Sequence, residues 1–330
     1  MADVIRWGVL GAGGIAGVVG ADIAATPGNE VVAVGARALD RAAGLAEQLG
    51  APRSYGTYDE LVADPDLDVV YIATTHGQHH EHALLTLRAG HPALVEKAFT
   101  LNAREGREVI AEARARQLFC MEAMWMRFNP LVRAAADAVA SGRIGELISV
   151  RSDLSTRFEF DPAHRLFDLA AGGGALLDMG IYPTTFAWLF LGRPDDVRAT
   201  GSLSPTGSDT TVAMQWSYNG GRFAHVACTT LGANPLFGLV AGSDGWISID
   251  GHLARPKSIT IHDASGDEVL TDQLAGNGYQ PQALEVERCL RAGELESPIV
   301  PLDETVAILE VLDEARAQLG VRYGADHVLH

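Results

Sequence analysis

Cysteine is scarce in this chain of 330 residues. Its three cysteines, Cys120, Cys228 and Cys289, are widely spaced, and no two of them form a Cys-x-x-Cys pair. A disulfide framework and a thiolate zinc site are therefore not expected. Free thiols are typical of a reducing compartment, so the expected location is cytoplasmic.

Long apolar runs are also missing. Asp3 and Arg6 interrupt the first residues of the chain, so a signal peptide is not expected. No stretch reaches the roughly 18 uninterrupted apolar residues that a membrane-spanning helix requires. The sequence therefore predicts no membrane partner.

Basic residues are few relative to acidic ones, 25 against 42, which gives a formal charge of −17. A surface of this sign disfavours nucleic acids and anionic membranes as partners, because both bind positive surfaces. A small basic pocket for one anionic ligand remains compatible with it. The 47% hydrophobic content argues against disorder, and the length predicts about two domains.

The first third of the chain alternates between strand-like and helix-like segments. This order predicts a parallel sheet with helices on both of its faces. The expected strands are 4–10, 30–36, 68–73, 93–96 and 119–122, and the expected helices are 14–25, 40–49, 80–89 and 103–116.

The rest of the chain is rich in strand-like runs separated by turns. Asn219-Gly220-Gly221 is typical of a hairpin turn between two such runs. We expect a mostly antiparallel sheet covered by helices. The expected strands are 146–156, 197–203, 210–218, 222–230, 236–241, 246–250 and 258–262, and the expected helices are 130–141, 175–191, 281–292 and 303–319.

A glycine-rich turn joins the first expected strand to the first expected helix. Gly11, Gly13 and Ala16 fit the pattern G-x-G-x-x-A, with Gly14 and Ile15 between them. Gly11 permits the tight turn, Gly13 lets the backbone approach a pyrophosphate, and Ala16 permits close helix packing. The turn predicts a dinucleotide site in a Rossmann domain; a glycine-rich turn of another α/β fold is the alternative.

The end of the second expected strand indicates which dinucleotide binds. NAD sites commonly have an acidic residue there, whereas this chain has Arg37 and Arg41. Arginine forms paired contacts with phosphate, so the two residues favour NADP, with NAD possible. Two solvated arginines at a helix start are the alternative.

Several motifs together resemble the glucose–fructose oxidoreductase / inositol dehydrogenase / MocA family over nearly the whole chain. Residues 122–128 and the Tyr182 ending are similar to the branch of dimeric dihydrodiol dehydrogenases and NADP-dependent D-xylose dehydrogenases. The motifs are the Gly11 loop, the Arg37 turn, residues 74–79, Glu96-Lys97, residues 122–128, residues 172–183 and residues 296–302.

The resemblance implies a fold and an assembly. It implies a Rossmann NADP-binding domain over residues 1–123. Residues 124–330 would then form an α+β domain with an open, mostly antiparallel sheet, for substrate binding and oligomerisation. A small sugar or diol would bind between the domains, and the open sheet face would join subunits into a homodimer or homotetramer.

Three residues are candidates for the chemistry. Asp178 and Tyr182 are four residues apart on an expected helix, hence on one face. Alcohol oxidation requires a base for the hydroxyl proton, and an ammonium group favours a phenolate. We therefore expect Tyr182 to be the acid/base, Lys97 to assist it and orient the substrate, and Asp178 to orient Lys97 or a substrate hydroxyl. Ala98 replaces a family proline, which removes the usual chance of a cis bond there.

Further site residues follow from the resemblance. His80 and His82 are expected to be exposed, and no metal is expected at the histidine cluster. Trp125, Arg127, Phe158 and Phe160 are expected to line the substrate site. Cofactor contacts are expected from Thr74, Thr75, His76, His79, Glu96, Lys97, Arg165 and Tyr279.

The expected activity is an NADP-dependent oxidoreductase that moves a hydride between a sugar or cyclic diol and nicotinamide. An NAD-using glycosidase, which shows no net cofactor reduction, is one alternative. A non-catalytic NADP-binding sensor is the other, although Lys97, Asp178 and Tyr182 together argue against it.

Overall fold

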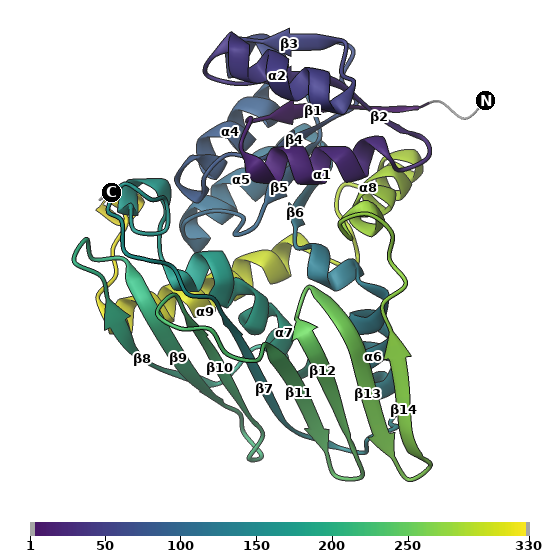
Figure 1. The fold of residues 1–330 in the computed structure, drawn as a ribbon, viewed down its shortest axis with the longest axis vertical. Helices are drawn as coiled ribbons and strands as arrows, with labels where there is room; N and C mark the ends of the chain where they lie inside the picture. Colours follow the sequence, from purple (N-terminus) through teal and green to yellow (C-terminus); the bar gives the residue numbers. More distant parts are fainter. Residues whose placement is uncertain (1–3, 328–330) are drawn as a thin grey trace. The chain divides into compact units, whose positions relative to one another are not determined.

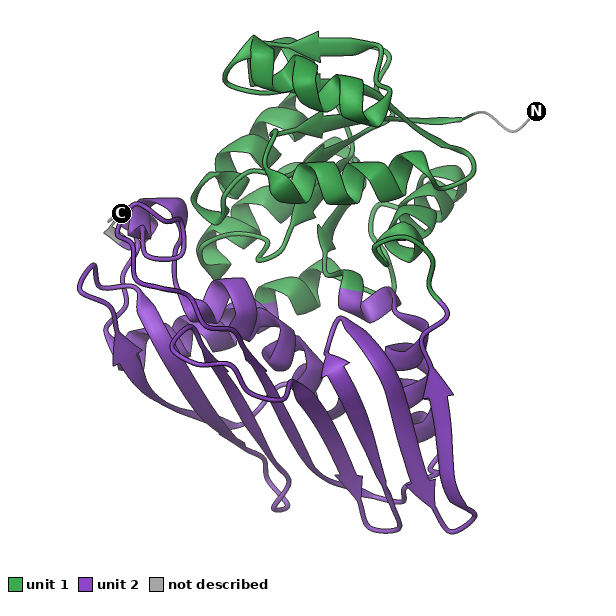
Figure 2. Cartoon of the chain, viewed as in Figure 1, with its two compact units in different colours: residues 1–125, 274–306 green, residues 126–273, 307–330 purple. Residues whose placement is uncertain are grey.

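Contacts within the chain divide it into two units, and the computed structural model describes residues 4–327. Unit 1 comprises residues 1–125 and 274–306, and unit 2 comprises residues 126–273 and 307–330 (Figure 2). The sequence-based boundary after residue 123 did not include the return of residues 274–306 to unit 1. The assignment of one function to each domain stays a prediction.

The sheet of unit 1 has six parallel strands in the order β3-β2-β1-β4-β5-β6 (Figure 1). Every residue of β4 and β5 is buried, as is typical of parallel strands covered on both faces. The strands are β1 (Ile5–Leu10), β2 (Asn29–Gly35), β3 (Arg53–Tyr55), β4 (Val69–Ile72), β5 (Ala93–Glu96) and β6 (Cys120–Ala123).

Helices α1 to α5 alternate with the strands of unit 1, which confirms the expected parallel α/β arrangement, and α8 joins the unit from later in the chain. Strand β3 and helix α3 were not expected, because both are too short to show a clear period. The helices are α1 (Gly14–Ala24), α2 (Leu39–Leu49), α3 (Tyr58–Val62), α4 (His76–Ala89), α5 (Ala103–Arg116) and α8 (Gln280–Ala292).

The sheet of unit 2 has eight strands in the order β14-β13-β12-β11-β7-β10-β9-β8. Strands β7 and β10 pair in parallel and the other neighbours are antiparallel, so the expected mostly antiparallel sheet is confirmed. The strands are β7 (Leu147–Ser155), β8 (Asp196–Leu203), β9 (Asp209–Ser217), β10 (Phe223–Thr229), β11 (Phe237–Gly242), β12 (Trp246–His252), β13 (Arg255–Asp263) and β14 (Gly266–Thr271).

One face of the unit 2 sheet is covered and the other is open. Helices α6 (Pro130–Ala140) and α7 (Ile181–Leu191) pack on the covered face (Figure 1). Side chains alternate along each strand: Ala224, Val226 and Cys228 of β10 are buried, whereas His225 between them is exposed. We call the face that carries His225 the open face. The last long helix, α9 (Leu302–Leu319), contributes residues to both units.

The helix expected over residues 175–191 is not uniform. Residues Leu176–Gly180 form a π-helical turn, and α7 begins only at Ile181. Shorter 3₁₀ turns occupy η1 (Trp125–Phe128), η2 (Leu169–Ala171) and η4 (Gly324–His327). Within residues 4–327, no helix combines the length and apolar character needed to span a bilayer.

Candidate cofactor and active site

Expected cofactor residues of unit 1, and the expected substrate residue Trp125, follow the carboxyl ends of its strands. The Gly11 loop follows β1, Arg37 follows β2, Thr74 follows β4, Lys97 follows β5 and Trp125 follows β6. These strands are parallel, so their carboxyl ends lie along one edge of the sheet. Open α/β sheets bind their ligands at this edge.

The glycine loop has the geometry that a pyrophosphate requires. Gly11 has φ +113°, and a Cβ atom there would lie 2.8 Å from the carbonyl oxygen of Ala73. Beside Gly13 and Gly14, by contrast, a Cβ would meet no atom within 4 Å. The first turn of α1 carries no acidic residue, and its free N–H groups favour an anion. The residues present therefore fit a dinucleotide.

Two arginines add positive charge near this loop. The Arg41 guanidinium donates a hydrogen bond from Nη2 to the carbonyl oxygen of Ala12, at 2.8 Å. Arg37 is exposed, and its charge adds to burial in lowering the pKa of His82 to about 4. Both arginines therefore lie near the carboxyl ends of β1 and β2, where the sequence predicts the 2′-phosphate of NADP.

The turn after β5 differs from the expectation for Ala98. The peptide bond between Lys97 and Ala98 is cis, so the prediction that the missing proline removes a cis bond is wrong. Imidazole groups of α4 contact both carbonyl groups: His76 Nε2 lies 3.1 Å from Lys97 O, and His79 Nδ1 lies 2.8 Å from Ala98 O. Tertiary contacts thus surround this turn where a proline ring is absent.

The histidines of α4 are less exposed than the sequence suggested. His79 is completely buried, and burial lowers its pKa from 6.5 to about 4. Its Nε2 faces the carbonyl oxygen of Thr74 at 3.1 Å. The His79 side chain therefore joins the turns after β4 and β5, and its expected cofactor contact stays a prediction.

His82 corrects a second expectation, because it is 4% exposed rather than a surface residue. Its ring meets Tyr58 of the unforeseen helix α3 edge to face at 4.5 Å, and its Nδ1 lies 3.0 Å from Thr74 Oγ1. His80 is partly exposed and lies 2.8 Å from Glu108. Among residues 4–327, no group of histidine, cysteine and carboxylate side chains could hold a metal ion.

Glu96 fixes the backbone that carries Lys97. Its carboxylate is buried and accepts hydrogen bonds from the Tyr71 hydroxyl at 2.6 Å and from the Lys97 N–H at 3.2 Å. Thr75 lies at the N-cap of α4. The Glu96 side chain thus holds the backbone N–H of Lys97, the first residue after β5.

An aromatic pair lies at the last strand end. Trp125 is 8% exposed and stacks on Tyr279, with ring centroids 4.2 Å apart and planes 29° from parallel. The two residues are 154 positions apart in the chain, yet both belong to unit 1. Arg127 follows in the same 3₁₀ turn but belongs to unit 2.

The remaining chemistry residues belong to unit 2. Asp178 lies in the π-helical turn and Tyr182 in the first turn of α7. Arg165 holds Asp178 with two nitrogen–oxygen contacts, at 2.9 and 3.3 Å. The Tyr182 ring is 7% exposed and meets His252 edge to face at 5.3 Å. The sequence carried no motif that singled out His252.

Phe158 and Phe160 contribute to one cavity of about 390 Å³ in unit 2, whose lining is partly aromatic and partly polar. Phe160 meets Phe167 edge to face at 5.1 Å, and the exposed side chains of Leu203 and Leu231 also line the cavity. The structure therefore brings these two expected substrate residues together with further apolar groups.

Asp209 is a buried acid that the sequence analysis missed. Its Oδ2 accepts a 2.6 Å hydrogen bond from the N–H of Leu176, at the start of the π-helical turn. Gly174 has φ +139°, and a Cβ there would lie 2.3 Å from Asp209 Oδ1, so this approach requires glycine. Tyr323 donates from its hydroxyl to Gly173 O at 2.9 Å. The glycine turn before Asp178 is thus held from both sides.

We expect Asp209 to make the free energy of unfolding depend on pH. Burial raises the pKa of its carboxyl from 3.8 to about 6. Between these values the folded chain holds the proton more tightly than the unfolded chain. The Asp209 contribution is therefore most favourable below the unfolded pKa, and it falls as pH rises toward the folded value, by about 3 kcal/mol.

Denaturant unfolding of the wild type and Asp209→Asn, between about pH 4 and about pH 7, measures this contribution. The difference in unfolding free energy, wild type minus variant, should fall as pH rises. A difference independent of pH would contradict a buried carboxyl that ionises in the folded protein.

Comparisons with known proteins agree with this geometry. Residues 5–124 match an oxidoreductase family with an NAD-binding Rossmann fold, and residues 132–248 match the GFO/IDH/MocA C-terminal domain. The trans-1,2-dihydrobenzene-1,2-diol dehydrogenase of Mus musculus is 37% identical over 98% of this chain and 99% of its own. The enzyme of the same name from Homo sapiens is 35% identical over the same shares.

Solved structures show the same fold. A 3-ketoreductase from Actinomadura kijaniata, in complex with NADP and TDP-benzene, is 25% identical with a TM-score of 0.83, covering 96% of this chain and 98% of its own. Aldose-aldose oxidoreductase from Caulobacter crescentus has a TM-score of 0.87 at 22% identity, with the same coverage.

The strand order, the glycine loop and these matches define a class of protein, the NAD(P)-dependent dehydrogenases with a Rossmann domain. The chain belongs to the glucose–fructose oxidoreductase / inositol dehydrogenase / MocA family. The family match assigns an NAD-binding Rossmann fold to residues 5–124, so the cofactor is a nicotinamide dinucleotide.

Proposed function

We propose that this protein is an NADP-dependent dehydrogenase that oxidises a C–OH group of a sugar or a cyclic diol. The observation that carries the proposal is the presence of Lys97 at a strand end and of Asp178 and Tyr182 in adjoining helical turns. They occur in a chain whose relatives, matched over 98% of its length, are named dihydrodiol dehydrogenases.

The proposed mechanism assigns one task to each of these groups. Bound NADP supplies the acceptor for the hydride of the alcohol carbon. The Tyr182 oxygen takes the hydroxyl proton, and the Lys97 ammonium favours its phenolate form and orients the hydroxyl. Asp178 orients Lys97 or a second substrate hydroxyl. Arg165 keeps the Asp178 carboxylate in one orientation through its paired contacts.

The residues after β2 are the basis for the proposed preference for NADP over NAD, because the end of this strand contacts the ribose in this fold. After β2 the chain has Ala36-Arg37-Ala38 and no acidic residue that would accept a 2′-hydroxyl bond. Arg37 and Arg41 supply positive charge for a 2′-phosphate, and the Arg41 contact with Ala12 O places it beside the glycine loop. Arg133 lies on α6 and not after a strand of unit 1, so it serves in the Discussion as the control for a change of charge.

A ring-shaped substrate is proposed from the aromatic side chains. Phe158 and Phe160 line a cavity of about 390 Å³ together with Phe167 and two leucines, and the Trp125 indole forms a second aromatic group with Tyr279. Flat apolar walls of this kind contact a carbocyclic or pyranose ring. The proposal therefore favours cyclic diols and aldoses over linear alcohols.

The test is a cofactor-reduction screen with the purified protein over trans-dihydrodiols, aldoses and inositols, with NADP and NAD in parallel. We expect NADPH to appear with at least one cyclic diol or aldose. Release of an aglycone from a glycoside without net NADPH would instead show a glycosidase. Tight NADP binding without turnover over the whole panel would show a sensor.

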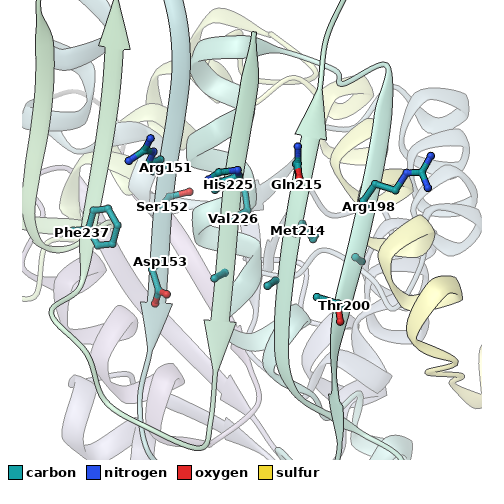
Figure 3. A pocket seen from close by; sticks show the side chains of 13 residues that line it. Arg151, Ser152, Asp153, Arg198, Thr200, Met214, Gln215, His225, Val226 and Phe237 are labelled. Carbon is teal, nitrogen blue, oxygen red and sulfur yellow. The ribbon is translucent and has the colours of Figure 1, made fainter. Parts of the chain in front are cut away.

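Association of subunits is proposed through the open face of the unit 2 sheet. A hollow of about 490 Å³ lies on that sheet, and the short side chains of Ala213 and Ala227 are among the residues that line it. Figure 3 shows three larger side chains of its lining, Arg151, His225 and Phe237, on neighbouring strands. A sheet face that its own helices leave uncovered suits a second copy, giving a homodimer or homotetramer. Sedimentation as a monomer would contradict this.

A cytoplasmic location is part of the proposal. The three cysteines are free and buried, as is usual for proteins of reducing compartments. Detection of the protein in a secreted fraction would contradict it.

A further inference from the structure

A buried carboxylate joins the first helix of unit 1 to the distant segment that carries Tyr279. Asp22 lies on α1 and is 2% exposed. Its oxygens accept bonds from the Asn277 N–H at 3.0 and 3.1 Å, from Asn277 Nδ2 at 3.0 Å and from the Tyr279 N–H at 2.8 Å. The partners are separated from it by 255 and 257 positions in the chain.

The fit between this carboxylate and the segment is close. Gly276 has φ +59°, and a Cβ there would lie 2.7 Å from Asp22 Oδ1. A buried carboxylate is costly unless hydrogen bonds replace its water, and here amide N–H groups do so. The contact therefore tolerates little change on either side, and it determines where the backbone of Tyr279 lies.

Asp22 acts on one end of helix α8 only. Further along α8, Glu287 accepts a 2.8 Å bond from Asn29 Nδ2, and Asn29 Oδ1 in turn accepts from the Trp7 indole at 2.8 Å. The helix thus has a second anchor to unit 1. Loss of the Asp22 contact is expected to release Tyr279 without releasing α8.

The position of Tyr279 matters because its ring stacks on Trp125. Helix α1 begins at the glycine loop, so the position of α1 in unit 1 determines the position of the expected pyrophosphate site at its N-terminus. Asp22 lies near the opposite, C-terminal end of α1, so this helix connects the glycine loop to the segment that carries Tyr279. The sequence predicts a cofactor contact for Tyr279 and a substrate contact for Trp125, its stacking partner.

We propose that Asp22 is a positioning residue, which sets the Trp125–Tyr279 stack relative to the cofactor-binding helix and thereby the binding of the substrate ring. The inference rests on the proposed function for its effect on substrate. Its effect on the aromatic pair stands on the contacts of unit 1 alone.

The first experiment is optical and needs no substrate. Near-ultraviolet circular dichroism is recorded for the wild type, for Asp22→Asn and for Trp125→Phe, which identifies the contribution of the stacked indole. Asparagine keeps the size of the side chain but turns an NH₂ group toward N–H donors. We expect Asp22→Asn to lose the same band that Trp125→Phe loses.

Asp64→Asn is the matched control. Asp64 is also a buried carboxylate of unit 1, 6% exposed, but it contacts Arg53, the Tyr55 hydroxyl and the N–H of the nearby Asp66. Asn277→Ala removes a single bond from the loop side, and serves if Asp22→Asn does not fold. We expect the band to persist in the control and to weaken in Asn277→Ala.

The second experiment separates cofactor from substrate. In Asp22→Asn the KM for the alcohol should rise about tenfold, whereas the Kd for NADP, measured by titration calorimetry, should stay within about threefold. An unchanged dichroism band together with an unchanged KM would overturn the inference. If no alcohol substrate exists, the proposed function fails, and the optical comparison still decides the role of Asp22.

Discussion

Replacing Tyr182 by phenylalanine is expected to lower kcat by about two to four orders of magnitude. The change removes the oxygen that exchanges the substrate proton. It keeps the ring, which is 7% exposed and lies against His252, so the packing of α7 is preserved. Stopped-flow absorbance of NADPH at saturating substrate measures the rate, and titration calorimetry with NADP checks that cofactor binding is unchanged.

Tyr218→Phe is the control for this variant. Tyr218 is another tyrosine of unit 2 with the same 7% exposure, and its hydroxyl donates to Gly192 O at 2.8 Å. Its loss should lower the free energy of unfolding by about 1 kcal/mol and leave turnover near the wild-type rate. Normal NADP binding with normal turnover in Tyr182→Phe would refute the acid/base assignment.

An aspartate at position 37 is expected to reverse the cofactor preference. In Arg37→Asp, the ratio of kcat/KM for NADP to that for NAD should fall by about 100-fold. The arginine cation contacts a phosphate through paired donors, whereas an aspartate repels the phosphate and accepts bonds from ribose hydroxyls. Steady-state kinetics with both cofactors at one substrate concentration measures the ratio.

The control for net charge is Arg133→Asp, which changes the charge of the chain by the same amount on an exposed position of α6. Its cofactor ratio should remain that of the wild type. If the ratio is also unchanged in Arg37→Asp, Arg37 does not hold a phosphate. High salt should weaken NADP binding to the wild type more than to Arg37→Asp. Salt screens the attraction between Arg37 and the 2′-phosphate, and the variant lacks this attraction.

Sequence reasoning succeeded where a short motif coincides with the end of a regular element. The strand before Gly11, the strand before Lys97 and the helix over residues 103–116 lie where the periodicity predicted them. Local chemistry determines such features: β-branched runs favour strands, and glycine permits a turn that other residues resist. The edge at which these residues meet then follows from parallel topology alone.

Sequence reasoning failed where exposure depends on a distant segment. His82 lies in a polar helical segment and was expected on the surface, but Tyr58 and Thr74 contact its ring. The carbonyl groups of Lys97 and Ala98 meet imidazoles some twenty positions away, at His76 and His79. No local pattern records contacts of this kind.

By itself, the sequence determined the class of fold, the dinucleotide loop and the identity of the groups proposed for chemistry, because each depends on neighbouring residues and on element order. Only the tertiary structure decided that residues 274–306 belong to unit 1, that Arg165 holds Asp178, and that Asp22 holds Tyr279. The last two are polar contacts between residues 13 and 257 positions apart, beyond the reach of any local periodicity. Their energies depend on burial and distance, which arise only when the chain is folded.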